Sequence, residues 1–357
     1  MAITYQKISF QDIIDGSHIE GDIYGIAQRS LLKARKDAFL ANPFLEDKNA
    51  TMLLLAKVDD VVCGKRMFYP TKVRANGDVI NTLGGSNYYV HPDYRKYALG
   101  GSMIMSAAKK ANIFMLSAGC SPDSLKIYEA MKAVRFLFPQ YTIPTRLFPH
   151  CRIKGLRMMA GLLKGAWNNT KLIAVYKKVA QASKRLNEQY VVKELSKVPE
   201  WAEAMVLNDG HSYMEYHNKE WLQWNLDYNF GGGPETGNLQ KFFALYEQEQ
   251  PIGFFMITER IRKDGNIGFV QEWQTANPSK LSDADLLMMA ICHFSENVDY
   301  ITIATAQQET QTTLLKYGFV ENGKANIVLK DLLKKYEDVG DINKWRIRLG
   351  YADFIMS

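Results

Sequence analysis

The chain has 357 residues, of which 47% are hydrophobic and 23% charged, an ordinary globular composition that excludes a disordered or collagen-like protein. Its net charge of +6 is unevenly divided, because residues 1–187 carry 28 Lys and Arg against 13 Asp and Glu, whereas residues 188–357 carry 16 against 25. At roughly 100–200 residues per domain, the length and this division together predict two domains.

The cysteines and the N-terminus exclude further classes of protein. The four cysteines stand far apart, with no Cys-x-x-Cys pair and no clustered histidines, which argues against a zinc site or a disulfide framework. No bound metal is expected. The N-terminus lacks the charged-then-apolar layout of a signal peptide, and no run reaches the roughly 18 uninterrupted apolar residues of a membrane span. We expect a cytoplasmic protein.

The first half of the chain reads as a mixed α/β unit of about 140 residues. The turn signals Asp59-Asp60 and Asn76-Gly77-Asp78 separate three β-type runs, and the second signal is of the Asn-Gly hairpin kind. In chain order the pattern predicts a strand at 3–10, a helix at 22–41, strands at 52–58, 61–73 and 79–90, a helix at 101–111, a strand at 113–117 and a helix at 123–134.

The second half repeats this order. It predicts strands at 242–246, 252–261 and 267–275, a helix at 283–294, a strand at 300–305 and a helix at 309–317. A shift of 186 residues places Pro92 on Pro278, each directly after a long third strand, and aligns the helices and strand that follow. We therefore predict a duplication.

A basic segment lies between the two copies. Residues 130–187 contain twelve Lys or Arg and no acidic residue. Apolar residues recur there at helical spacing: Leu156, Met159, Leu163 and Trp167, then Leu172, Tyr176 and Val179. We expect connecting amphipathic helices with a basic outer face, and an organisation of three parts: a first domain at 1–145, a helical connector at 146–190 and a second domain at 191–357.

One junction carries a chemical signal. In the stretch YYVHPDYRKYALGGSMIMSAAKKA, residues 88–111, a strand ends at Val90 and an amphipathic helix begins near Gly101. Unpaired amides and the helix dipole make such a helix start an anion site, and small residues let a pyrophosphate approach the backbone. The junction lacks the Lys-Ser/Thr ending of a nucleotide P-loop and follows a hairpin, which argues against both P-loop and Rossmann folds.

The same residues resemble the GNAT superfamily of acyl-CoA-dependent N-acyltransferases. The family motif Arg/Gln-x-x-Gly-x-Gly/Ala appears here as Arg95-x-x-Ala98-x-Gly100, after the family-like VHPDYR. Downstream, Tyr128 and Glu129 match a family pattern on the last helix, although Ser121 and Ser124 replace its Asn and Ala. The match covers residues 50–140, and the second copy agrees in layout only. The resemblance implies an α/β fold of two tandem GNAT-like units, each a mixed, largely antiparallel sheet flanked by helices.

The resemblance also implies roles for individual residues. Tyr89 and Val90 at the strand end would bind the pantetheine and polarise the thioester carbonyl, and Tyr128 would protonate the leaving thiolate. The general base would be His91, or a water held by Asn87 and Ser117. The coenzyme A pyrophosphate would be held by Arg95 and by the amides of Lys96, Tyr97, Ala98, Leu99, Gly100 and Gly101.

The second copy does not retain these residues. At the 186-residue shift, Leu281, Ala284, Leu286 and Leu314 replace Arg95, Ala98, Gly100 and Tyr128. Asp283 and Asp285 stand where phosphates would approach and would repel them. We therefore expect a degenerate cofactor site and a role in recognising the acceptor, with Glu272 and Trp224, from the aromatic-rich stretch 215–228, as candidate contacts.

The leading functional hypothesis is an acyl-CoA-dependent N-acyltransferase that uses acetyl-CoA and a small-molecule or glycan primary amine. Two alternatives stay open: a Fem-type aminoacyl-tRNA-dependent transferase, which also pairs two GNAT-like units, and a catalytically silent acyl-CoA-binding protein. For the basic segment 146–187, the alternatives are a solvated face balanced by the acidic second half and contact with an anionic membrane surface at the inner membrane face. A nucleic-acid partner is not expected.

Overall fold

The computed structural model describes residues 2–16, 33–108, 114–118, 120–145, 156–228, 239–260 and 265–350. The first half forms β1 (Ile3–Ser9), α1 (Phe10–Ile14), α2 (Lys33–Leu40), β2 (Thr51–Val58), β3 (Val61–Ala75), β4 (Asp78–Val90), the 3₁₀ turn η2 (Pro92–Tyr97), α3 (Leu99–Ala108), β5 (Phe114–Ala118), α4 (Pro122–Ala130) and β6 (Val134–Pro144).

The second half begins with one long helix. It forms α5 (Leu156–Asn187), β7 (Val191–Leu195), α6 (Glu200–Leu207), β8 (Tyr213–Glu215), α7 (Lys219–Asp227), β9 (Leu239–Glu247), β10 (Gln250–Arg260), β11 (Ile267–Thr275), α8 (Asp283–Ala290), η4 (Ile291–His293), β12 (Tyr300–Ala304), α9 (Gln308–Lys316), β13 (Val320–Asp331), η5 (Ile342–Lys344) and β14 (Trp345–Arg346).

The predicted duplication is visible in the order of elements. Strand β12 and helix α9 begin and end 186 residues after β5 and α4, and β13 begins 186 residues after β6. The chain therefore folds as two units of the same plan, and the predicted fold class is confirmed.

Short hairpin turns set the register of each unit. Asn76 and Gly77 both have positive φ, of 51° and 93°, as the Asn-Gly signal predicts for a type I′ turn. Asp59 and Asp60 join β2 to β3 with φ of 46° and 66°. Gln248 and Glu249 repeat that turn between β9 and β10 with φ of 45° and 69°, so the duplicated hairpin keeps its geometry without glycine.

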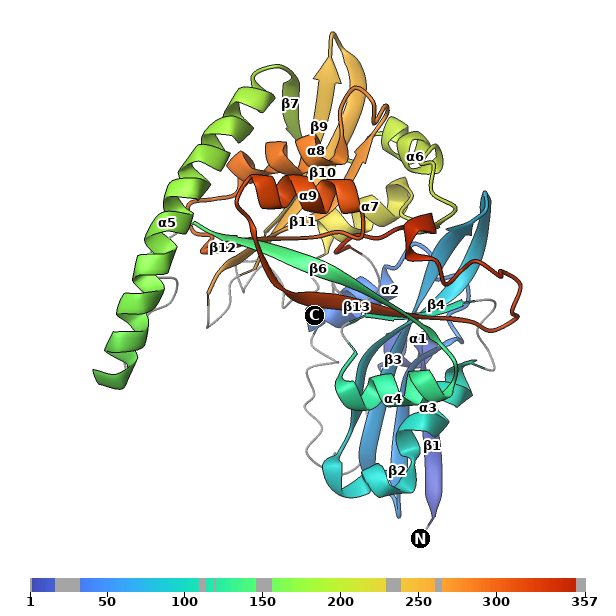
Figure 1. The fold of residues 1–357 in the computed structure, drawn as a ribbon. Coiled ribbons are helices and arrows are strands. Elements are labelled where there is room, and N and C mark those ends of the chain that lie inside the picture. The colour runs from blue at the N-terminus through green and yellow to red at the C-terminus, as the bar shows by residue number, and fades with distance from the viewer. Residues whose placement is uncertain are drawn as a thin grey trace.

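The two units share one sheet. Its strand order is β1-β2-β3-β4-β5-β13-β6-β12-β11-β10-β9-β7, with β8 and β14 off this path. Strand β13 of the second half lies between β5 and β6, and β6 of the first half lies between β13 and β12. Figure 1 shows β6 and β13 crossing the junction together. The last strands are thus exchanged, and the sheet does not divide at residue 145 as the predicted domains do.

Both exchanged strands were missed in the sequence. The predicted helix 123–134 ends at Ala130, and Val134 already begins β6. Pro139 lies within β6 and argues against a strand in the sequence, because proline cannot donate a backbone hydrogen bond to a neighbouring strand. It pairs with Lys324 beside a register shift in β13, where Gly323 has φ of 86°. The predicted strand 3–10 is confirmed, whereas the predicted helix 22–41 is represented only by α2, since residues 17–32 lie outside the described part.

Within its described residues, 156–190, the basic connector forms one helix, α5, whose second part packs on the second unit (Figure 1). The Val179 side chain is buried in the core of that unit, and the Ser183 hydroxyl donates to the Met289 carbonyl. The charged residues of α5 in the described stretch 170–187 are all exposed, as predicted: Lys171, Lys177, Lys178, Lys184 and Arg185. No helix in the described residues is long and apolar enough to cross a membrane.

Candidate functional site

A polar cavity opens where β4 and β5 part. Their parallel pairing runs from Thr82–Phe114 to Gly85–Ser117. Just beyond, β4 bulges against β3, and Asn87 adopts a positive φ of 48°. Bulges turn a strand aside and are common next to active sites. The cavity at this point has a volume of about 210 Å³ and is lined by Arg66, Gly85, Ser86, Asn87, Tyr88, Ser117, Cys120, Ser121, Ser124 and Tyr128.

A buried arginine forms one wall of this cavity. Arg66 is only 1% exposed, and its Nη2 donates to the Tyr128 hydroxyl at 2.7 Å and to the Ser117 hydroxyl at 3.1 Å. The two hydroxyls are themselves 2.8 Å apart. The guanidinium also lies over aromatic rings, 5.6 Å from the centroid of Tyr88 and 5.8 Å from that of Tyr128. Sequence reasoning missed Arg66, which stands in β3 directly after another basic residue, Lys65.

The absence of a side chain at Gly85 leaves room for the Arg66 side chain. A Cβ at Gly85 would lie 2.2 Å from Arg66 Nη2 and 3.0 Å from Ser117 Oγ. On the neighbouring position, a Cβ at Gly84 would lie 2.0 Å from the Tyr69 ring. Two adjacent glycines inside a strand signal such close approaches. This pair is the signal that could have pointed to Arg66.

Tyr128 reaches the cavity from α4. Ser121 caps this helix by accepting from the Ser124 amide, Pro122 occupies its first turn, and Leu125 and Tyr128 are buried one turn apart on the same face. The structure therefore brings together five residues that the sequence analysis named: Tyr128, Ser117, Asn87, Ser121 and Ser124. His91 is not among the lining residues; its ring instead accepts from the Asp93 amide at the start of η2.

The predicted anion cradle follows the same strand end. Ala98 has φ of 55° and ends η2 in the left-handed conformation, and α3 begins at once with Leu99. Helix geometry leaves the amides of Leu99, Gly100 and Gly101 without intrahelical partners. The first turn of α3 holds no acidic residue. It therefore keeps the positive end of the helix dipole uncompensated by its own side chains.

Two basic side chains border the cradle. Arg95 Nε donates to the Val90 carbonyl at 3.2 Å, and Arg95 Nη1 pairs with Asp123 at 2.8 Å, which ties β4, η2 and α4 together. The Lys96 ammonium lies 5.1 Å above the Tyr97 ring. A Cβ at Gly100 would lie 1.7 Å from the Tyr88 hydroxyl, so this glycine makes room for Tyr88, whose pKa burial raises to about 12.

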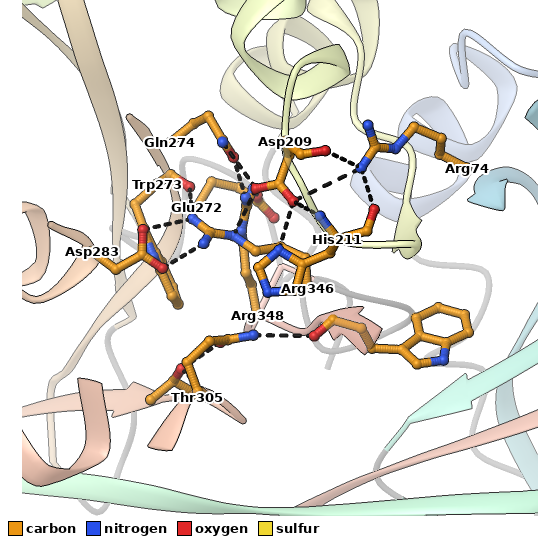
Figure 2. Close-up of polar contacts among 12 residues, drawn as sticks. Arg74, Asp209, His211, Glu272, Trp273, Gln274, Asp283, Thr305, Arg346 and Arg348 are labelled. Carbon is orange, nitrogen blue, oxygen red and sulfur yellow. Dashed lines mark hydrogen bonds and ion pairs between the residues drawn. The ribbon is translucent and has the colours of Figure 1, made fainter. Parts of the chain in front are cut away.

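The second unit places a larger cleft at the start of α8, and Figure 2 shows its polar contacts. The cleft has a volume of about 910 Å³, and Asp209, Asp283, Asp285 and Glu309 are among its lining residues. Arg346 binds Asp283 through both terminal nitrogens, and Asp283 and Asp285 are the acidic residues of the first turn of α8. A helix start that already holds carboxylates opposes a phosphate.

The two candidate acceptor contacts are interior residues. Glu272 is fully buried; its carboxylate accepts from His217 Nδ1 at 2.9 Å and pairs with Arg348 Nη1 at 2.7 Å. The Trp224 indole is 4% exposed and donates to the Ala38 carbonyl at 2.8 Å. Neither lines one of the two cavities above. Across the described ranges, no group of three or more His, Cys, Asp or Glu could hold a metal.

Comparisons agree on the fold. No family model and no curated protein matches the sequence. A GCN5-related N-acetyltransferase structure from Anabaena variabilis is similar with a TM-score of 0.54 at 12% identity, covering 93% of this chain and 73% of that chain. Saccharomyces cerevisiae N-myristoyltransferase with bound myristoyl-CoA gives 0.55 at 12% identity, covering 92% and 82%.

A third similar structure, a GCN5-related N-acetyltransferase from Kribbella flavida, gives a TM-score of 0.51 at 10% identity, covering 93% and 72%. Over more than nine-tenths of its length, the chain has the fold of the GNAT N-acetyltransferases and of N-myristoyltransferase, a tandem form of that fold. The predicted resemblance is confirmed. At these identities the likeness is one of fold, and the reaction is a separate question.

Proposed function

We propose that the protein is an acyl-CoA-dependent N-acyltransferase that transfers an acetyl group from acetyl-CoA to a primary amine by direct attack on the thioester. The observation that carries this proposal is the arrangement in the first unit. There, a cavity at the parting of β4 and β5 holds the Tyr128 hydroxyl, and the acid-free start of α3 follows the same strand end. A volume of about 210 Å³ suits a thioester and a short acyl group.

The proposed roles follow from these positions. The amides from Lys96 to Gly101 would hold the coenzyme A pyrophosphate, and Arg95, which borders this cradle, would contribute a positive charge. The strand end at Tyr89 and Val90 would hold the pantetheine, because the bulge at Asn87 frees backbone groups there. Tyr128 would give its proton to the departing sulfur. Asn87 and Ser117 both line the cavity, which supports the water they would hold as the route for the proton of the amine.

The direct test is a reaction. We expect the protein to release coenzyme A thiol from acetyl-CoA only when a suitable primary amine is present, with the acetylated amine identified by mass spectrometry from amine pools. Acetyl-CoA binding, thiol release and a transfer assay with aminoacyl-tRNA together separate the alternatives. Binding of acetyl-CoA without thiol release for any amine would favour a silent binding protein, and transfer from aminoacyl-tRNA without acetyl-CoA binding would favour a Fem-type transferase.

The two helix starts predict an asymmetric stoichiometry. Because α3 has no acid in its first turn and α8 has Asp283 and Asp285, we expect one molecule of acetyl-CoA per chain. Isothermal titration calorimetry measures this number. A value near two would mean that the second unit also binds the cofactor, and would contradict the assignment of its cleft.

Charge at the cradle can be tested at a position with room for a side chain. A Cβ at Gly101 would meet only Ile127, at an ordinary 3.9 Å. We expect Gly101→Glu to weaken acetyl-CoA binding by tenfold or more, since a carboxylate at a helix start repels phosphate. Gly101→Gln, of nearly equal size, is the matched control and should weaken binding far less. Equal losses in the two variants would point to sterics rather than charge.

For the basic face of α5, contact with an anionic membrane surface stays a proposal. Exposed Lys171, Lys177, Lys178, Lys184 and Arg185 support it. Each Lys or Arg near an anionic surface contributes about 1 kcal/mol. We expect flotation with liposomes that contain anionic lipid, reduced by salt and absent with neutral liposomes. Failure to float with either kind would leave these residues as a solvated face.

A further inference from the structure

The charge of Arg66 has no anionic partner within the described part of the chain. Its Nε and Nη1 atoms have no hydrogen-bond partner, and the contacts of Nη2 are the neutral hydroxyls of Tyr128 and Ser117. Isolated buried charges are costly, and proteins keep them paired. Cation–π contacts with Phe68, Tyr88 and Tyr128 offset part of the cost without supplying a negative charge.

The second unit shows how the equivalent place is filled in the duplicate. Arg66 stands six residues after the Asp59-Asp60 turn, and Phe255 stands six residues after the equivalent Gln248-Glu249 turn. At the 186-residue shift, Ile303 replaces Ser117 and Leu314 replaces Tyr128. Phe255, Ile303 and Leu314 are all buried members of one hydrophobic cluster. The duplicate thus closes the site with apolar side chains, whereas the first unit keeps a charge and two hydroxyls around a cavity.

We propose that Arg66 is an anion-binding group of this cavity and that the anion is the sulfur of coenzyme A as it leaves as a thiolate, a role that rests on the proposed acyltransferase function. The Tyr128 hydroxyl, 2.7 Å from Arg66, is the group that the proposed mechanism places at the sulfur. Arg66 lines the same cavity and then acts on the same atom as Tyr128, through the positive charge of its guanidinium.

The step balances as follows. The amine nitrogen attacks the thioester carbon, the C–N bond forms, the C–S bond breaks and its electron pair stays on sulfur. The positive guanidinium stabilises that charge, and Tyr128 donates its proton to the sulfur. The proton lost by the amine nitrogen passes to the water held by Asn87 and Ser117 and replaces the proton lost by Tyr128. No oxidant, reductant or metal takes part.

The test measures the sulfur directly. Coenzyme A is bound to the protein and its thiol is titrated by thiolate ultraviolet absorbance across the ordinary thiol pKa of about 8.5. In the wild-type complex we expect a pKa at least one unit below that of free coenzyme A, a tenfold or greater preference for the thiolate. In Arg66→Gln the value should return to that of free coenzyme A, and Arg66→Lys should fall between. Arg135→Gln, at an exposed arginine, is the charge-matched control and should leave the shift unchanged.

Stability supplies a second readout. Because the charge of Arg66 is not paired, Arg66→Met should leave the melting temperature of the ligand-free protein unchanged or raise it. A large decrease in the melting temperature of Arg66→Met would mean that Arg66 stabilises the fold, and would contradict the proposal. Coenzyme A binding separates this proposal from the proposed function. If coenzyme A does not bind the wild type, the proposed function fails.

If coenzyme A binds and Arg66→Gln leaves its thiol pKa unshifted, the function stands and the role of Arg66 is overturned. A selective loss of succinyl-CoA binding in Arg66→Gln, without a change in the thiol pKa, would likewise overturn it. That result would make a carboxylate on the acyl group the partner of the arginine.

Discussion

Replacing Tyr128 with phenylalanine should lower kcat by about 10²–10⁴-fold, the range typical of a lost general acid, while acetyl-CoA affinity changes little. The reason is geometric. The Tyr128 hydroxyl is held by Arg66 and Ser117 at 2.7 and 2.8 Å inside the cavity, and the ring is buried at 3% exposure. The substitution keeps the ring and removes the hydroxyl, which is the proposed proton donor and also the acceptor for Arg66 Nη2. Steady-state kinetics with calorimetric measurement of acetyl-CoA binding checks both halves of the expectation.

A matched control separates chemistry from packing. Tyr141 is buried to a similar degree, at 2% exposure, but packs in the core of the second unit. Tyr141→Phe should leave kcat within about twofold. The same kcat in Tyr128→Phe as in the wild type, with the chemical step shown to limit turnover, would make Tyr128 a packing residue and remove it from the mechanism.

Removing the buried carboxylate of Glu272 should lower the free energy of unfolding by about 3–5 kcal/mol, the range for breaking a buried ion pair. His217 and Arg348 both contact Glu272, and the three side chains are fully buried. Glu272→Ala would leave their charges without this partner. Denaturant unfolding measures the effect, with Glu309→Ala at an exposed position as a control that should stay within about 0.5 kcal/mol. A decrease in the free energy of unfolding of less than about 1 kcal/mol for Glu272→Ala would contradict the proposed contribution of these ion pairs to stability.

The same pair predicts the pH dependence of stability. Burial alone would lower the pKa of His217, but the charge of Glu272 and the hydrogen bonds to Glu215 and Glu272 raise it above its ordinary 6.5. Its stabilising contribution is then complete below about pH 6.5 and is lost as the pH rises through the raised value.

Glu272 acts in the opposite direction. Burial alone would raise its pKa, but the charges and hydrogen bonds of His217 and Arg348 lower it below the ordinary 4.5. Its contribution is complete above about pH 4.5 and is lost as the pH falls through the lowered value. We expect Glu272→Ala to lose most stability between these two limits. A constant difference between variant and wild type at every pH would contradict the coupling.

The sequence accounts for one side of the candidate site and not for the other. The α3 cradle and Tyr128 were accessible because each depends on local pattern: a strand end, a turn, a helix start and one spaced aromatic residue. Arg66 was not, because its role depends on Gly85 of the adjacent strand and on residues 51 and 62 positions further along the chain. The Gly84-Gly85 pair was the only local trace of that approach.

By itself, the sequence determined many of the local elements and the duplication, but not strands β6 and β13. The turns at Asn76-Gly77 and Asp59-Asp60 and the alternation of the strands depend on near neighbours in the chain. The 186-residue shift is visible because the same order of such local signals occurs twice. Only the tertiary structure decided which strands meet. Strands β6 and β13 cross into the opposite halves, and the charged side chains of His217, Glu272 and Arg348 are buried against each other. Pairing partners far apart in the chain are chosen by the burial and hydrogen bonding of the whole sheet, and no short window of residues contains that information.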